Sequence, residues 1–306
     1  MRVPDAILSC VAYVYATNRQ GDSDNPHGTA FFVSVPSESL PEKRHIYLVT
    51  AKHLLEGTGL SLQYNSRSGK RASVRLPNAQ AWYVHPDEGV DLAALLLDEG
   101  FEWLADVDYE GVPLANFAHH VHVEEFDPIG IGDDLLVTGL LVSHPGTERN
   151  IPIVRAGIIS AMPGDTLKDI DKAGQEGPPY RAYLAELHST GGLSGSPVFV
   201  VIGPARMVEI GKDTWTQGGG IGGISFSLLG VIRGHWYTRG NSATAGALLD
   251  DEGEVNRGIA KVTPIKLLEE ILMDETKTTA KDDRIERDRK RSQIWSKTKP
   301  IDKGGA

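Results

Sequence analysis

Short apolar runs recur along the first 263 residues, and each is bounded by glycine, proline or polar residues. Most of these runs are rich in β-branched and aromatic side chains, which is typical of strands rather than helices. The runs that we interpret as strands cover residues 7–15, 28–33, 46–51, 60–64, 72–76, 90–97, 130–139, 151–160, 180–187, 198–202, 227–234 and 259–263. The 34 Gly and 17 Pro supply the many turns between them. The pattern therefore predicts an all-β fold.

The segment after the last of these runs has a helical period. Residues 264–272 place apolar side chains at i, i+3 and i+4, which predicts an amphipathic helix with Thr263 as N-cap and Pro264 at the first helical position. Residues 274–306 are charged and poor in apolar side chains, so we expect a flexible tail that is helical only in part. Residues 284–291 mix basic and acidic side chains, which fits a solvated helix face or, as the alternative, a surface for an anionic partner.

Charge and cysteine content narrow the class of protein. A net charge of −10 gives no reason to expect nucleic-acid binding, although the tail is mildly basic. The N-terminal apolar stretch is too short to cross a membrane and lacks the pattern of a signal segment. Cys10 is the only cysteine, so no intramolecular disulfide can form, and its apolar surroundings favour a small buried side chain. We therefore expect a cytoplasmic protein without membrane contact.

One loop has the composition of a nucleophile loop. Residues 191–197 read Gly-Gly-Leu-Ser-Gly-Ser-Pro and are followed at once by the apolar run 198–202. Three glycines around Ser194 indicate a tight loop that presents the serine hydroxyl. Serine is a weak nucleophile until a base takes its proton and backbone donors stabilise the oxyanion. Taken alone, the loop could equally hold a turn serine without chemistry.

A histidine and an aspartate lie at the ends of two other runs. His53 closely follows the run 46–51, and Asp91 directly precedes the apolar residues 92–97. Asp91 is a better candidate than Asp87 because the buried run begins beside it. Taken singly, the histidine could be a partly buried structural residue and the aspartate a capping residue. Together with Ser194 they supply a base, a group that orients it and a nucleophile, in the chain order His, Asp, Ser.

This order, and the strands that carry the three residues, resemble the chymotrypsin-like (trypsin-like) serine peptidases. The run 28–33, the His-Pro pair at 85–86 and the run 151–160 also match that family, so the resemblance covers residues 5–273. It implies two six-stranded antiparallel β-barrels, a C-terminal α-helix and a catalytic triad.

The resemblance also implies a binding cleft. It assigns the oxyanion hole to the backbone N–H groups of Gly192 and Ser194. The substrate-binding positions would be His188, Ile232, Arg233 and Gly234. With His188 at its base, the pocket holds no carboxylate to pair a buried cation, so we expect acidic or medium-sized residues rather than Lys or Arg before the cleaved bond.

One position departs from the secreted members of the family. Leu193 stands where their zymogens carry an aspartate that pairs with a freed N-terminus. The oxyanion hole must therefore form without that ion pair or be switched in another way.

Two further motifs give weak indications of ligands. Residues 218–223 contain the pattern G-x-G-x-x-G, but no βαβ unit surrounds it, which favours a loop. His120 and His122 would share one face of a strand, yet no third metal ligand is suggested nearby. We therefore expect no metal and no cofactor.

The sequence predicts a serine endopeptidase that hydrolyses peptide bonds of protein or peptide substrates through an acyl-enzyme. One alternative is an esterase-like acyl hydrolase with the same triad. Another is a catalytically silent or conditionally active module that binds a regulatory protein partner through its cleft or tail. The expected division is a first barrel over residues 1–115, a connection over 116–129, a second barrel with the C-terminal helix over 130–273, and the tail over 274–306.

Overall fold

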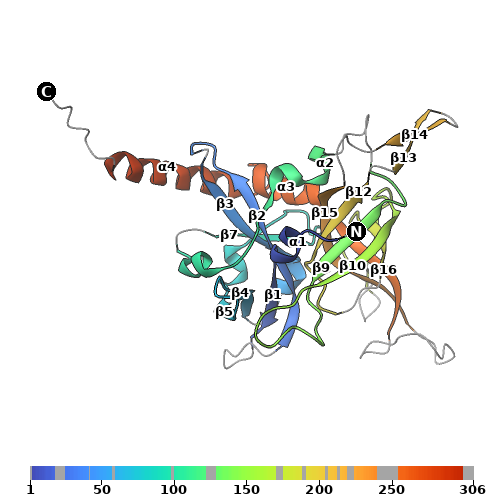
Figure 1. Cartoon of the computed structure of the whole chain (residues 1–306), viewed down its shortest axis with the longest axis horizontal. Coiled ribbons are helices and arrows are strands. Elements are labelled where there is room, and N and C mark those ends of the chain that lie inside the picture. Colours follow the sequence, from blue (N-terminus) through green and yellow to red (C-terminus); the bar gives the residue numbers. More distant parts are fainter. Residues whose placement is uncertain are drawn as a thin grey trace.

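The strands of the protein form a closed barrel, a larger sheet and a separate hairpin (Figure 1). The structure, a computed structural model, describes residues 2–17, 25–40, 42–56, 59–97, 100–121, 129–169, 175–187, 191–203, 206–211, 214–218, 224–239 and 254–298. The predicted all-β fold with a C-terminal helix is confirmed.

The first half of the chain forms an eight-stranded sheet. Its strands are β1 (Val11–Ala16), β2 (Asn25–Pro36), β3 (Arg44–Thr50), β4 (Leu60–Asn65), β5 (Arg71–Arg75), β6 (Tyr83–Val84), β7 (Ala93–Leu97) and β8 (Val112–Pro113). Seven of them follow the order β5-β4-β1-β2-β3-β7-β6, and β8 pairs with β2. Within the residues described, the end strands β5 and β6 do not pair with each other, so this half is an open sheet where the resemblance implies a closed barrel.

The second half forms the closed six-stranded barrel that the sequence predicts. Its strands are β9 (Asp134–Gly139), β10 (Ile153–Ala161), β11 (Tyr183–Leu187), β12 (Pro197–Ile202), β15 (Ser225–Arg239) and β16 (Glu254–Pro264), in the order β10-β11-β16-β15-β12-β9. A two-stranded hairpin of β13 (Arg206–Gly211) and β14 (Thr214–Gly218) stands apart from it. Gly218 ends β14, and the rest of the glycine-rich motif lies outside the described residues.

The described part of the chain also contains helices. They are α1 (Asp5–Ser9), α2 (Ala118–Val121), α3 (Ile265–Met273) and α4 (Ala280–Thr298), with 3-10 turns η1 (Lys52–Leu55), η2 (Ala79–Ala81), η3 (Glu102–Asp106) and η4 (Leu114–Asn116). The predicted amphipathic helix is α3, but Pro264, not Thr263, occupies its N-cap. No helix in the described part of the chain is both long and apolar enough to cross a bilayer.

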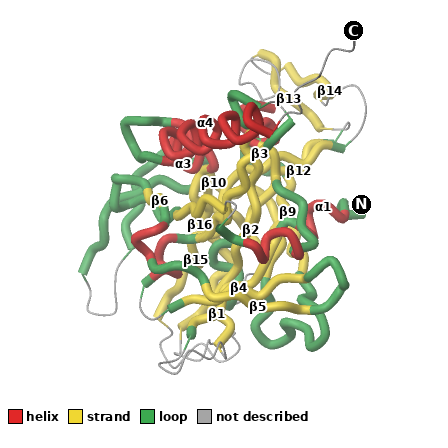
Figure 2. Tube along the Cα trace, turned by 90° about the vertical axis from the view of Figure 1, so that its left-hand side faces the viewer, coloured by secondary structure: helices red, strands yellow, loops and turns green. Residues whose placement is uncertain are grey.

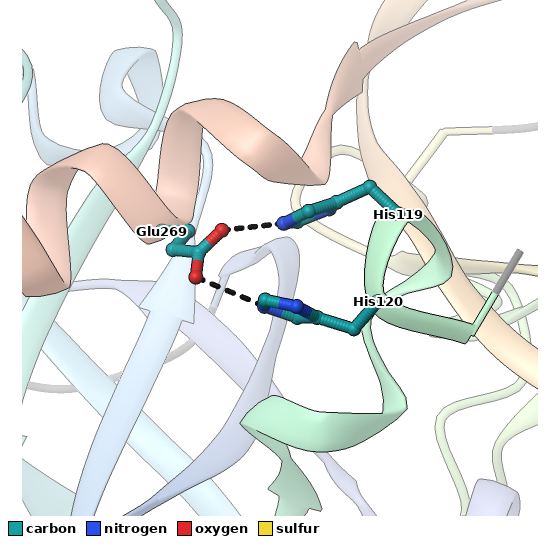
Figure 3. A group of neighbouring side chains, drawn as sticks. All are labelled: His119, His120 and Glu269. Atoms are coloured by element: carbon teal, nitrogen blue, oxygen red, sulfur yellow. Dashed lines mark hydrogen bonds and ion pairs between the residues drawn. The ribbon is translucent and has the colours of Figure 1, made fainter. Parts of the chain in front are cut away.

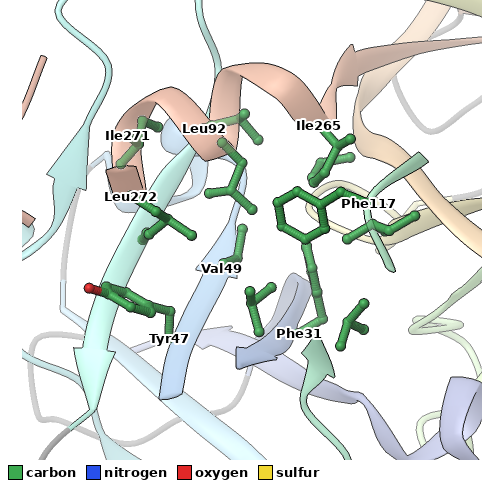
Figure 4. Packing of buried hydrophobic residues seen from close by; sticks show 14 of the residues in the cluster. Phe31, Tyr47, Val49, Leu92, Phe117, Ile265, Ile271 and Leu272 are labelled. Carbon is green, nitrogen blue, oxygen red and sulfur yellow. The ribbon is translucent and has the colours of Figure 1, made fainter. Parts of the chain in front are cut away.

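A single buried cluster joins the sheet, the barrel and α3 (Figure 4). It includes Phe31, Val49 and Leu92 from the sheet side, Phe199 and Leu228 from the barrel, and Ile265, Leu268, Ile271 and Leu272 from α3. Leu92 follows Asp91 directly, so this packing fixes the backbone that carries the aspartate. Cys10 is fully buried in the same cluster, where burial raises the pKa of its thiol, as expected for a small apolar side chain.

Helix α4 lies beside α3 (Figure 2). It carries two buried charged side chains. Arg284 is 2% exposed and donates to Tyr47 Oη at 3.1 Å. Asp288 is 3% exposed and accepts hydrogen bonds from Ser37 Oγ at 2.7 Å and His45 Nε2 at 2.9 Å. The expectation of a flexible tail is therefore wrong for this stretch. Arg284 and Asp288 have hydrogen-bond partners inside the protein, which composition alone cannot reveal.

Candidate active site

Strand pairing in the first sheet brings His53 and Asp91 together. β3 and β7 run antiparallel with Thr50 opposite Ala93, so residues just after β3 and just before β7 lie at the same edge. The turn η1 begins there and carries the histidine. His53 Nδ1–H donates to Asp91 Oδ2 at 2.7 Å, and the His53 backbone N–H donates to Asp91 Oδ1 at 2.9 Å. Both carboxylate oxygens thus hold one histidine in one orientation.

The surroundings keep the Asp91 carboxylate ionised. Its side chain is 7% exposed, whereas that of His53 is 40% exposed. Burial raises the pKa of Asp91, but the hydrogen bonds from His53 and the positive charge of Arg233 outweigh burial and hold the pKa below its ordinary value. An ionised carboxylate keeps the proton on His53 Nδ1, which leaves Nε2 with the lone pair that a general base needs.

Backbone hydrogen bonds hold the loop that carries Ser194. Its carbonyl oxygen accepts from Thr29 N–H at 2.9 Å, and the next residue, Gly195, donates its N–H to Ile232 O at 2.8 Å. Thr29 Oγ1 also donates to Gly192 O at 2.8 Å. The loop is therefore attached to β2 of the sheet and to β15 of the barrel, although it belongs to neither strand.

Close packing at Gly195 brings this loop toward His53. Gly195 has a φ of 82°, and a Cβ there would overlap Thr29 O and lie 2.5 Å from Thr50 Oγ1. Thr50 ends β3, three residues before His53. Only glycine permits both this backbone conformation and this approach. The serine loop thus packs against the strand end that leads to the histidine.

Two backbone N–H groups of the loop are available for a ligand. Within the part of the chain that the structure describes, neither Gly192 N–H nor Ser194 N–H donates a hydrogen bond. Gly192 has a φ of 95°, a conformation that favours glycine. Both are the groups that the family resemblance assigns to the oxyanion hole, and free donors are what an oxyanion hole requires.

The third contact of the predicted triad is not formed. Among the described residues, no hydrogen bond joins Ser194 Oγ to His53 Nε2. Catalytic hydrogen bonds are often long without substrate and tighten when substrate binds. The structure therefore brings His53 and Asp91 into direct contact and Ser194 into their neighbourhood.

The predicted cleft residues have different environments. Ile232 is fully buried, and its backbone supports the serine loop. Arg233 donates to Asp169 Oδ2 at 3.2 Å and to Gly89 O at 2.6 Å, and its guanidinium lies 3.8 Å from the centre of the Tyr180 ring. Its position at a substrate pocket stays a prediction. A side chain at Gly234 would meet open space, and His188 lies outside the described residues.

A charged cluster that the sequence did not reveal lies beside the histidine. Asp169 accepts from Lys261 Nζ at 2.6 Å and from Tyr180 Oη at 2.7 Å, in addition to Arg233. Burial raises the pKa of Asp169, but these donors outweigh burial and hold it below its ordinary value. A cavity of about 400 Å³ is lined by this cluster and the pair, through Lys52, His53, Glu56, Glu88, Asp91, Asp169, Pro178, Arg233 and Lys261. Asp169 and Lys261 belong to separate segments with no motif, so sequence patterns gave no signal.

The histidine-rich segment between the two halves differs from the expected strand. Its described part is helical, as α2, so the strand that would align His120 with His122 is not present there. His122 lies outside the described residues. His119 and His120 instead both contact the carboxylate of Glu269 on α3 (Figure 3). The sequence suggested no such third group, because Glu269 lies 149 residues away from His120.

No family model and no curated protein matches the chain. Among solved structures, the chain is similar to the active form of the Rv3671c protease from M. tuberculosis, with 17% identity over 90% of this chain and 84% of that chain, and a TM-score of 0.45. It is similar to an inactive form of the same protease, with 16% identity over 88% of this chain and 89% of that chain, and a TM-score of 0.42. It is also similar to Deg5, with 13% identity over 64% of this chain and 76% of that chain, and a TM-score of 0.37. At these TM-scores the functional assignment depends on the residues of this chain.

Proposed function

We propose that the protein is a serine endopeptidase. Ser194 Oγ attacks the carbonyl carbon of a peptide bond while His53 Nε2 takes the hydroxyl proton. The N–H groups of Gly192 and Ser194 donate to the oxyanion. His53 then returns the proton to the leaving amine, which breaks the C–N bond and leaves an acyl-enzyme. A water that gives its proton to His53 attacks the ester, and the released serine is protonated again.

The observation that carries the proposal is the His53–Asp91 pair, whose two residues are joined by two hydrogen bonds. A structural ion pair needs only one contact, whereas here one carboxylate oxygen of Asp91 accepts from the ring of His53 and the other from its backbone N–H, while the His53 side chain remains 40% exposed. The pair lies where the serine loop packs on the end of β3. These are the orientation and the access that a general base requires.

The substrate is proposed to be a protein or peptide. Arg233 and Lys261 line the cavity beside the pair and share one carboxylate, Asp169. The same cavity is also lined by Lys52, Glu56, Glu88 and Asp91, so its charges do not favour acidic over basic substrate side chains. The expected preference for acidic or medium-sized residues depends on the pocket around His188 and is retained as part of the proposal.

Two observations favour a second candidate, an enzyme that is active only under certain conditions. Leu193, fully buried, replaces the aspartate of the trypsin-like activation ion pair, and the bond between Ser194 and His53 is not formed among the described residues. A partner or a substrate that moves the loop so that Ser194 Oγ meets His53 Nε2 would complete the triad. This candidate shares the residues of the first and differs only in basal turnover.

Hydrolysis of a mixed peptide library and of activated esters tests the proposal. We expect wild type to cleave peptides and Ser194→Ala to be inactive, while Ser196→Ala, which removes a neighbouring buried hydroxyl without a partner among the described residues, retains activity. Cleavage of esters alone would favour the acyl hydrolase. If Ser194→Ala kept both its peptidase and its esterase activity, Ser194 would be excluded as the nucleophile.

A further inference from the structure

Two histidines and one glutamate form a compact cluster that shares no residue with the proposed triad. His120 Nε2–H donates to Glu269 Oε1 at 2.9 Å, and His119 Nε2–H donates to Glu269 Oε2 (Figure 3). One nitrogen of each ring and one carboxylate oxygen all lie within 4.8 Å of one another. We propose that this cluster, His119–His120–Glu269, is a binding site for a divalent transition-metal ion, with Zn²⁺ as its ligand.

The donor set favours zinc. Two imidazole nitrogens and one carboxylate oxygen form a three-ligand zinc site, in which water occupies the fourth position. Nitrogen donors disfavour Mg²⁺ and Ca²⁺, which prefer oxygen ligands. Ligands at about 2.0–2.1 Å from a tetrahedral ion lie roughly 3.3 Å apart. His120 Nε2 and Glu269 Oε1 are already 2.9 Å apart, and all the donor atoms lie within 4.8 Å of one another. Each neutral imidazole then binds the ion through Nε2 and carries its single proton on Nδ1 instead.

The backbone on both sides of the cluster is fixed without an ion. Helix α3 is anchored by Leu268 and Ile271, which are fully buried on either side of Glu269. Phe117, which precedes α2, is also fully buried, and its carbonyl accepts from His120 N–H at 2.9 Å. Donors held on rigid elements lose little freedom when they bind an ion.

An ion can reach the cluster from solvent. The side chains of His120 and Glu269 are 41% and 24% exposed. Glu269 also lines an open surface hollow of about 500 Å³. The hollow is bordered by four carboxylates, Glu269, Glu270, Asp274 and Glu275, and by two lysines, Lys266 and Lys281. This excess of negative charge raises the local concentration of cations.

A bound ion would join the segment between the two halves to the helix that packs beside Asp91. Because the unfolded chain holds no such arrangement of donors, binding should stabilise the folded protein. At a zinc concentration about 100-fold above Kd, we expect the melting temperature to rise by several degrees.

Calorimetric titration of the EDTA-treated full chain with ZnCl₂ tests the proposal. We expect one ion per chain at micromolar concentrations, and a tetrahedral d–d spectrum when Co²⁺ replaces Zn²⁺. Glu269→Gln and His120→Ala should each weaken binding at least about tenfold. His144→Ala, which removes an exposed histidine outside the cluster, should leave it unchanged.

Glu269→Gln decides the outcome even if His120→Ala folds poorly, because glutamine preserves the size of the side chain and its helix. Absence of binding at one equivalent of zinc would overturn the proposal. Binding that is undiminished in Glu269→Gln would do the same, since the ion would then use other donors.

Discussion

The two sides of the candidate active site are held together by different means. On the sheet side, the two carboxylate oxygens of Asp91 hold His53 through its ring and its backbone N–H. On the barrel side, hydrogen bonds to the backbone of a loop with two positive-φ glycines hold Ser194, whose hydroxyl has no partner among the described residues. The acid–base pair is thus preorganised by the fold, whereas the nucleophile depends on the conformation of a single loop.

This difference indicates which side of the site can be regulated. The buried carboxylate of Asp91 accepts two hydrogen bonds and keeps its position unless the protein unfolds, because leaving a charge unpaired inside the protein costs several kcal/mol. A glycine-rich loop can change conformation at low cost. We therefore expect control of activity to act on residues 191–197 rather than on the pair.

The largest effect should come from removing the reacting groups. Ser194→Ala and His53→Ala should each reduce kcat by on the order of 10⁴-fold or more, because the two residues act as a unit. The double variant should be little worse than either single variant. Strictly additive losses, measured by steady-state kinetics on one peptide substrate, would contradict the assignment of a shared mechanism.

The orienting role of Asp91 should be separable from the nucleophile. Asp91→Asn removes the charge that keeps the proton on His53 Nδ1, so kcat should fall about 10⁴-fold while the fold is retained. Proton NMR checks the cause. The downfield Nδ1–H resonance of His53 should disappear in Asp91→Asn and persist in Ser194→Ala, and the reverse result would refute the division between the two sides.

Gly195→Ala should damage the barrel side alone. An added Cβ would overlap Thr29 O, and alanine is strained at a φ of 82°, so the loop must move and kcat should fall about 10²-fold. Gly191→Ala is the matched control, because a Cβ there meets no atom within 4 Å. Equal activity of the two variants would show that the loop position does not matter. The His53 resonance should be unchanged in both.

The smallest effect should come from helix α4, which supports β3 on the sheet side. Asp288→Asn should cost about 1–3 kcal/mol, because His45 and Ser37 lose a buried charged acceptor. Asp282→Asn, exposed on the same helix, should cost less than about 0.5 kcal/mol. Urea unfolding measures both, and equal values would indicate that α4 does not dock.

The difference in unfolding free energy between wild type and Asp288→Asn should depend on pH in a defined direction. Burial raises the pKa of Asp288. The hydrogen bonds from Ser37 and His45, together with the electrostatic effect of His45, outweigh burial, so the folded pKa lies below the ordinary value. Such a group stabilises the fold above its unfolded pKa, near about 3.9, and that contribution is lost as the pH falls through the folded pKa. The gap between wild type and Asp288→Asn should therefore close in acid.

The sequence was most informative where a chemical residue followed or preceded an apolar run. His53, Asp91 and the glycines around Ser194 were all identifiable in this way. It could not show contacts between residues far apart in the chain, such as Asp169 with Lys261 or His120 with Glu269. It also misassigned the docked part of the tail, because Arg284 and Asp288 are buried through specific bonds that charge counting treats as solvation.

Covalent labelling tests the central claim, that Ser194 is a nucleophile activated by His53. A fluorophosphonate probe forms a phosphonyl ester with an activated serine, and peptide mass spectrometry locates the adduct. We predict one adduct on Ser194 in wild type and in Ser196→Ala, greatly slowed labelling in His53→Ala and none in Ser194→Ala. An adduct on another serine, or labelling of Ser194 at the same rate without His53, would contradict the account.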